Sequence, residues 1–251
     1  MSKLAGQTIL ITGAGRGLGH GVARGLAAHG AHVVAAARTA SELQELETTI
    51  TAAGGAITTY QVDLADESAV NHLASLALER FGTINTLINN AAVLRMRSFL
   101  ELPPHEFDAT IAINLLAPVQ LCRALLPSMI DAGRGSILNV TSAAGIRGFV
   151  DETDYCASKF GLEGFTYALA LECQPLNISV NLVSPGYRIK PTSVTAAEFE
   201  SWPEERRAEF HDPLSMADAF AWLATQDGSG TTGQRFNAWE LAERVRTVEW
   251  V

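Results

Sequence analysis

The chain has 251 residues, 47% of them hydrophobic and 18% charged, which is enough apolar sequence for a large core in one α/β domain. Its formal net charge of −9 argues against a nucleic-acid partner, because phosphate backbones bind to basic surfaces. Its three cysteines lack a Cys-x2-Cys spacing and its six histidines are dispersed, so we expect reduced thiols, no disulfide and no metal site.

The first predicted element is a buried strand over residues 8–12, which leads into the glycine-rich loop Gly13-Ala14-Gly15-Arg16-Gly17-Leu18-Gly19. A helical pattern follows and ends near Gly30. Glycines let the loop turn sharply and approach a phosphate, and a helix N-terminus offers free N–H groups and a positive dipole end. This order of elements predicts a dinucleotide site; the alternative is a glycine-rich turn without a ligand.

Strand-like and helical segments alternate along the rest of the chain. Strands are predicted at 8–12, 32–36, 57–62, 86–89, 136–141, 179–183 and 234–237, and helices include 41–53, 67–81 and 105–129. The alternation predicts a Rossmann-type, doubly wound α/β fold, with a mostly parallel seven-stranded sheet and helices on both faces. No repeat or linker divides the sequence, so we expect a single domain over residues 1–251. We recognise no secretory signal and no membrane-spanning run, and therefore expect a cytoplasmic protein without a membrane partner.

Three polar residues in the second half of the chain suggest proton chemistry. Ser142 follows the strand predicted at 136–141, and ligands of open α/β sheets bind at the carboxyl ends of strands. A lone serine in such a place is usually a turn former. Tyr155 and Lys159 are four residues apart in a helical pattern, so they share one helix face. A positive charge there favours the phenolate and lowers the pKa of the tyrosine, although a single Tyr-x3-Lys pair is a weak signal.

Together these features resemble the short-chain dehydrogenase/reductase family in its compact branch, over nearly the whole chain. The family's motifs match Thr12 to Gly19 (Thr-Gly-x3-Gly-x-Gly), Asp63 in Val62-Asp63-Leu64, Asn89-Asn90-Ala91-Ala92, Asn114, Ser142, Tyr155 with Lys159, and Pro185-Gly186. Each motif is weak alone, but all of them in this order form a specific signal.

The resemblance implies an oxidoreductase that transfers a hydride between a nicotinamide cofactor and a small carbonyl or alcohol substrate. It implies Tyr155 as general acid/base and Lys159 as the group that lowers its pKa and holds the nicotinamide ribose. Ser142 would orient the substrate oxygen, and Asn114, at a helix distortion, would connect Lys159 to water. The implied cofactor-binding residues are Gly13, Arg16, Gly17, Leu18, Gly19, Arg38, Asp63, Leu64, Asn90, Ala91, Tyr155, Lys159, Pro185, Gly186 and Arg188. The resemblance also implies a homodimer through the helices of Asn114 and Tyr155, or a homotetramer.

The residues after the second strand bear on the choice of cofactor. NAD-dependent relatives place a carboxylate there for the ribose 2′-hydroxyl, whereas this chain has Ala37 followed by Arg38. A guanidinium can hold a 2′-phosphate bidentately, and Arg16 is a second cation within reach. In the family this pair favours NADP(H) over NAD(H). The alternative is that Arg38 stacks on the adenine and Arg16 is solvated.

The chain departs from the family pattern in three places. Lys190 stands where the family has a threonine after Pro-Gly, so that Lys190 and Arg188 are candidates to recognise an anionic substrate. Ala92 replaces a glycine, which is harmless if its φ is negative. The C-terminal Asp-Gly-Gly region is replaced by a helical pattern over 238–245, which puts the tetramer in doubt.

Residues 187–215 are expected to form a variable lid over the site, with Pro203 between two short helices. Its aromatic residues, Phe199, Trp202 and Phe210, either cover a partly hydrophobic substrate or only pack the lid. Two other functions are weighed: a non-catalytic NADP(H)-binding regulator, and a 3-oxoacyl carrier-protein reductase. The complete catalytic set argues against the first, and the net charge of −9 is unfavourable for docking an acidic carrier protein.

Overall fold

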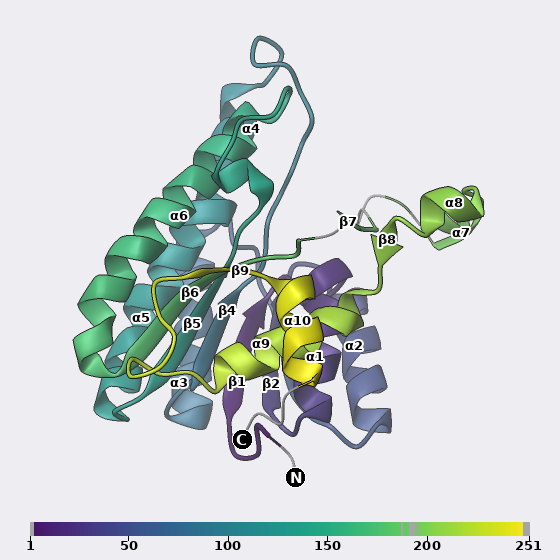
Figure 1. Ribbon diagram of the computed structural model, residues 1–251. Coiled ribbons are helices and arrows are strands. Elements are labelled where there is room, and N and C mark those ends of the chain that lie inside the picture. The colour runs from purple at the N-terminus through teal and green to yellow at the C-terminus, as the bar shows by residue number, and fades with distance from the viewer. Residues whose placement is uncertain (1–2, 187, 191–193, 195, 248–251) are drawn as a thin grey trace.

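A seven-stranded parallel sheet in the order β3-β2-β1-β4-β5-β6-β9 is the centre of the computed structural model, which describes residues 3–186, 188–190, 194 and 196–247 (Figure 1). The strands are β1 (Thr8–Thr12), β2 (His32–Ala37), β3 (Ala56–Gln61), β4 (Thr86–Asn89), β5 (Gly135–Val140), β6 (Ile178–Ser184) and β9 (Arg235–Asn237). The predicted strands are confirmed to within one residue at either end. The strand order reverses between β1 and β4, so a ligand crevice is expected at the carboxyl ends of these two strands.

Alternating side chains of the strands build a separate hydrophobic core on each face of the sheet. Ile9 and Ile11 of β1 pack toward one face and Leu10 toward the other. The first core lies under α1 (Gly17–Ala28), α2 (Ala40–Ala52), α9 (Ala217–Ala224) and α10 (Ala238–Arg246). The second lies under α3 (Glu67–Phe81), α5 (Ala117–Asp131) and α6 (Thr153–Cys173). Both faces are apolar because a parallel sheet needs helices on each side.

The helix predicted at 105–129 is a continuous stretch over Pro104–Asp131, formed by α4 (Pro104–Ile111), a π-helical turn (Ala112–Leu116) and α5. By length and composition alone, with a mean hydropathy of 1.6, this stretch passes the test for a membrane span, which the sequence inspection did not register. Leu121, Leu125 and Met129 are nevertheless buried in the second core. We therefore read it as a core helix.

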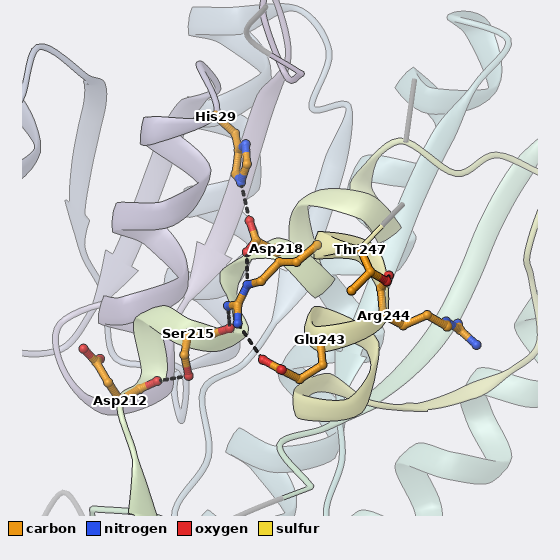
Figure 2. A network of polar contacts seen from close by, with 8 residues as sticks. His29, Asp212, Ser215, Asp218, Glu243, Arg244 and Thr247 are labelled. Atoms are coloured by element: carbon orange, nitrogen blue, oxygen red, sulfur yellow. Dashed lines mark hydrogen bonds and ion pairs between the residues drawn. The ribbon is translucent and has the colours of Figure 1, made fainter. Parts of the chain in front are cut away.

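The helix predicted over 238–245 is confirmed as α10, which packs on the first core. Figure 2 shows Asp218 of α9 at the centre of a polar network, and this carboxylate accepts from His29 Nε2 at 2.8 Å and from Arg246 Nε at 2.7 Å. Arg246 also pairs with Glu243 at 2.8 Å. Because His29 follows α1 and Arg246 ends α10, the network ties three helices of this face together.

The lid projects from the body beside β7 (Arg188–Ile189) and β8 (Phe210–His211), which pair as a small parallel sheet that the sequence did not predict (Figure 1). The predicted break at Pro203 is confirmed, because this residue separates α7 (Ala196–Glu200) from α8 (Glu204–Arg207). Of the cysteines, Cys122 and Cys173 are buried, Cys156 is half-buried and all three are free thiols.

Contact between α1 and α9 depends on a glycine, and this can be tested by Gly25→Ala. A Cβ on Gly25 would lie 2.1 Å from Cβ of Ala217, so one helix must move. We expect the free energy of unfolding to fall by about 1–3 kcal/mol in urea titrations. Gly148→Ala is the control, since a Cβ there meets nothing within 4 Å and should change stability by less than about 0.5 kcal/mol. Equal losses in both variants would contradict the tight contact.

Candidate active site

The carboxyl ends of β1, β2 and β4 open into a pocket with a volume of about 280 Å³. It lies at the reversal of strand order, where open α/β sheets bind ligands. Eight of the expected cofactor-binding residues line it. They are Gly13, Arg16, Leu18, Arg38, Asp63, Leu64, Asn90 and Ala91. The pocket therefore collects residues from five separate segments of the chain, the fifth being represented by Ile113.

The glycine loop is held by the strand next to it. Asn90 donates its side-chain amide to the carbonyl oxygens of Thr12 (2.8 Å) and Gly13 (3.2 Å). The hydroxyl of Thr12 in turn accepts the backbone N–H groups of Asn90 and Ala91, each at 3.1 Å. A Cβ on Gly19 would lie 2.3 Å from the Gly13 carbonyl oxygen, so this packing requires glycine. The loop is a rigid backbone cradle.

The N-terminus of α1 points its free N–H groups out of this cradle. Arg16 occupies the N-cap position and no side chain caps the helix. Gly17, with a φ of +59°, makes the turn into the first helical residue. Uncapped N–H groups and the positive end of the helix dipole form an anion site. The residues fit the pyrophosphate of a dinucleotide.

Glu42 introduces a carboxylate at the rim of the pocket, where the sequence analysis found none. It comes from α2 and lines the pocket beside Ala37 and Arg38. Arg16 pairs with it at 3.7 Å, with side-chain exposures of 57% for Arg16 and 28% for Glu42. Sequence spacing gives no sign of this pair, because only the packing of α2 against the loop brings Glu42 there. The rim thus carries two cations and one anion.

The segment after β3 forms another wall of the pocket. Asp63 lines the pocket, and its carboxylate accepts the backbone N–H of Ala65 at 3.0 Å. On the opposite side, Ala92 replaces the family's glycine. Among described residues other than glycine, only Asp151 and Asn177 have a positive φ, so the expectation that Ala92 is unstrained is met.

Tyr155 and Lys159 share a face of α6, as their spacing predicted. The Lys159 ammonium lies 5.7 Å from the centre of the Tyr155 ring. In the protein alone, burial raises the pKa of Tyr155, and its hydrogen bond with Ser142 only partly offsets this. The expectation that Lys159 lowers this pKa is therefore not met without a cofactor, because desolvation dominates.

Lys159 is almost completely buried, with 2% of its surface exposed. Its ammonium donates to the carbonyl oxygen of Val140, at the end of β5, at 2.8 Å. Burial lowers the pKa of Lys159 to about 8, and the negative charge of Glu163 opposes this. The lysine therefore titrates close to neutrality, where small changes around it alter its charge.

Asn114 lies in the π-helical turn between α4 and α5. Its side-chain oxygen accepts the backbone N–H of Val93 at 2.8 Å, and its amide donates to the Val93 carbonyl at 2.9 Å and to the Ser158 hydroxyl at 3.1 Å. Asn114 therefore ties the loop after β4 to α6. Its connection to Lys159 through water stays a prediction.

Two buried acids of α6 were missed by the sequence analysis. Asp154 accepts the backbone N–H of Tyr155 at 2.8 Å and the hydroxyl of Thr110 at 2.6 Å. Glu163 accepts the Thr141 hydroxyl at 2.6 Å beside Ser142. Helical spacing could have identified Glu163 from the sequence, because it follows Lys159 by one turn of the helix.

The segment after β6 is described in part. Pro185 and Gly186 follow the strand directly, and Gly186 has a φ of +80° with its Cα packed against Asn237. Arg188 contributes backbone to β7, and its side chain lies outside the described part of the chain. The ammonium of Lys190 donates to the Val194 carbonyl at 2.5 Å, within the lid.

Lys190 also borders a second hollow of about 230 Å³ between α1 and the base of the lid. Other basic residues there are Arg16, His20 and Arg24. The three lid aromatics pack on one another, with ring centres 5.3–5.7 Å apart for Phe199, Trp202 and Phe210. This contact favours the simpler interpretation, in which they stabilise the lid itself.

The buried ammonium should lower the stability of the fold, and Lys159→Met tests this. Because the pKa falls from 10.5 to about 8, the folded protein carries an unfavourable charge at any pH below 8. We expect the free energy of unfolding of the variant to be about 3 kcal/mol higher than that of the wild type at pH 7. The advantage should shrink between pH 8 and 10.5, where the unfolded lysine still holds its proton. A difference independent of pH in urea titrations would contradict this assignment.

Comparisons with known proteins agree with this geometry. A family model described as short chain dehydrogenase matches residues 7–201. The 3-oxoacyl acyl-carrier-protein reductase FabG of Thermotoga maritima is 31% identical over 241 residues, which cover 92% of this chain and 96% of that protein. A metagenomic short-chain oxidoreductase in complex with NADP is 36% identical, with a TM-score of 0.80 over 93% of this chain and 98% of that chain. Carveol dehydrogenase from Mycobacterium avium, in complex with NAD, is 25% identical, with a TM-score of 0.82 over 94% and 97%. The chain therefore belongs to the short-chain dehydrogenase/reductase family of oxidoreductases.

Proposed function

We propose that the protein is an NADP(H)-dependent oxidoreductase that interconverts a carbonyl compound and an alcohol, in a single catalytic domain over residues 1–251. The observation that carries this proposal is a buried ammonium, Lys159, beside a phenol, Tyr155, in a protein whose glycine loop lines a pocket at the carboxyl ends of the strands. Burial of such a charge lowers stability and has no evident structural use, which supports a catalytic role.

A nicotinamide dinucleotide fits the residues around the pocket. The close packing of Gly13 and Gly19 leaves backbone in place of side chains along its floor, and the uncapped start of α1 would hold the pyrophosphate. Leu18 would pack on the phosphate side, and Asp63, Leu64, Asn90 and Ala91 would line the adenosine. Pro185, Gly186 and the backbone of Arg188 would approach the nicotinamide. When bound, the nicotinamide would supply or accept the hydride. In its oxidised form it would also contribute a positive charge to the site.

In this mechanism the hydroxyl of Tyr155 gives its proton to the carbonyl oxygen of the substrate during reduction and becomes a phenolate. In the oxidation direction that phenolate takes the proton from the alcohol. Ser142, whose side chain lowers the pKa of Tyr155, orients the same oxygen and stabilises its developing charge. Lys159 supplies the positive charge that favours the phenolate once the site is filled. Asn114 keeps the loop of Val93 against α6, and this maintains the wall of the site.

The loops beside the site support a partly apolar substrate. The loop after β4 carries exposed Leu94 and Met96, and the loop after β5 carries exposed Ile146, Phe149 and Val150. A backbone hydrogen bond of 2.9 Å from Arg97 to Asp151 joins the two loops. A 3-oxoacyl carrier-protein substrate is a narrower alternative, supported by one named relative and opposed by the net charge of −9.

A homodimer through α5 and α6 completes the proposal. Five large apolar side chains in or immediately before these helices are exposed in the described part of the chain. They are Leu116, immediately before α5, Ile130 of α5, and Phe160, Tyr167 and Leu171 of α6. The last three recur at helical spacing, so they form one stripe that a second copy would bury.

Tyr155→Phe tests the catalytic assignment. Turnover of NADPH with a panel of carbonyl compounds should fall by about 10²–10⁴-fold, because the proton donor is lost. The affinity for NADPH, measured by fluorescence titration, should stay nearly unchanged. Tyr60→Phe removes a phenol from β3 and should keep full turnover. A Tyr155→Phe enzyme with more than about a tenth of wild-type turnover would refute the role.

Arg38→Ala and Glu42→Gln test the cofactor preference in opposite directions. Loss of the Arg38 guanidinium should weaken NADPH binding by about 10- to 100-fold and NADH binding far less. Glu42→Gln removes a negative charge from the same rim and frees Arg16, so NADPH should bind about 2- to 5-fold tighter. Fluorescence titrations with both cofactors give the ratio. Equal changes for NADH and NADPH would reject the 2′-phosphate interpretation.

A further inference from the structure

An arginine of the last strand reaches the turn that carries Ser142. In β9, Phe236 packs against the first core, so its neighbour Arg235 points to the opposite face, where α6 lies. The guanidinium donates to the carbonyl oxygen of Ser142 at 3.0 Å and, through Nε, to the carboxylate of Glu163 at 2.9 Å. One side chain therefore connects β9, the Ser142 turn and the helix of Tyr155.

Glu163 is the buried acceptor to which Arg235 and the neighbouring hydroxyls donate. Its side chain is only 6% exposed, and it accepts from the Thr141 hydroxyl at 2.6 Å and the Tyr167 hydroxyl at 3.3 Å besides Arg235. It lies one turn beyond Lys159 on the same face of α6. A carboxylate buried to this degree needs a cation, and Arg235, with 25% side-chain exposure, supplies it.

The peptide of Ser142 has little freedom between these groups. Its carbonyl oxygen also accepts the N–H of Gly145 at 3.0 Å. Gly145 is itself packed so closely that a Cβ would lie 2.7 Å from the Thr141 hydroxyl and 2.8 Å from the Glu163 carboxylate. The direction of the peptide fixes the Cα–Cβ bond of Ser142, and the N–H of Ala144, which donates to the Ser142 hydroxyl at 3.2 Å, belongs to the same turn. By holding this turn, the guanidinium also influences where the hydroxyl points.

We propose that Arg235 is a positioning residue, which holds the hydroxyl of Ser142 in line with Tyr155 by bridging the Ser142 carbonyl and the Glu163 carboxylate. The planar guanidinium suits this role because it can donate in two fixed directions at once. A displacement of about 1 Å at a reacting group can cost on the order of 10²-fold in rate, so the bridge is expected to act on kcat. The inference rests on the proposed function.

A double-mutant cycle between Arg235 and Ser142 tests the proposal. Arg235→Met should lower kcat by about 10-fold or more in the wild-type background. In a Ser142→Ala background the same change should lower kcat less than about 2-fold, because the hydroxyl that Arg235 orients is already absent. The dissociation constant for NADPH should stay unchanged in all four enzymes. Arg235→Lys, which retains the charge and a single donor group, should recover part of kcat.

Two further variants separate positioning from stability. Arg134 also donates to a backbone carbonyl, that of Thr225 at 3.1 Å, far from Ser142, so Arg134→Met should keep the wild-type kcat. Arg235→Met leaves Glu163 unpaired, and the double variant Arg235→Met/Glu163→Gln relieves that charge. It should fold with a Tm closer to wild type and still show the reduced kcat.

An equal loss of kcat from Arg235→Met in the wild-type and Ser142→Ala backgrounds would overturn the inference about Arg235 but not the proposed function. The arginine would then act independently of the hydroxyl. Recovery of full kcat in Arg235→Met/Glu163→Gln would also overturn it, because the loss would come from the unpaired carboxylate. Undiminished turnover in Ser142→Ala would contradict the proposed mechanism, and the inference with it.

Discussion

The buried ammonium of Lys159 is the constraint around which the site is arranged. A charge with 2% exposure is unfavourable unless polar groups surround it, and here the Val140 carbonyl and the nearby Glu163 carboxylate do so. These partners come from the end of β5 and from α6, so the two elements must keep their relative position. Ser142 follows β5 and Tyr155 starts α6, which places both beside the lysine. These two partners offset the desolvation of the ammonium only in part, because burial still lowers the pKa of Lys159. A bound ligand can therefore stabilise this charge further.

The cofactor pocket combines a rigid part with an adjustable one. Asn90 and Thr12 fix the glycine loop through backbone contacts, which leave little room for movement. The rim is different, because Arg38 is exposed and Arg16 is paired with Glu42 over 3.7 Å at the surface. A rigid cradle suits groups that all dinucleotides share. Discrimination between a 2′-hydroxyl and a 2′-phosphate then depends on the balance of charges at the rim, which single substitutions can shift.

The periphery of the fold distinguishes this chain from the family pattern. The last strand contributes Arg235 to the Ser142 turn, and the helix that follows it is tied by Arg246 to Asp218 of α9. The lid packs its own aromatic rings together, while the loops after β4 and β5 expose apolar side chains near the site. These loops and edges have conformations that local sequence patterns do not fix.

The sequence by itself determined the order of strands and helices, the glycine loop and the Tyr155–Lys159 face, because these depend on local periodicity and on contacts between near neighbours. Only the tertiary structure decided which distant side chains meet. Glu42 reaches the pocket through the packing of α2, and Arg235 reaches Glu163 across 72 positions in the chain. It also decided how deeply each group is buried, and in the protein alone this burial raises the pKa of Tyr155. Spacing along a helix specifies which residues are neighbours, whereas desolvation depends on everything that covers them.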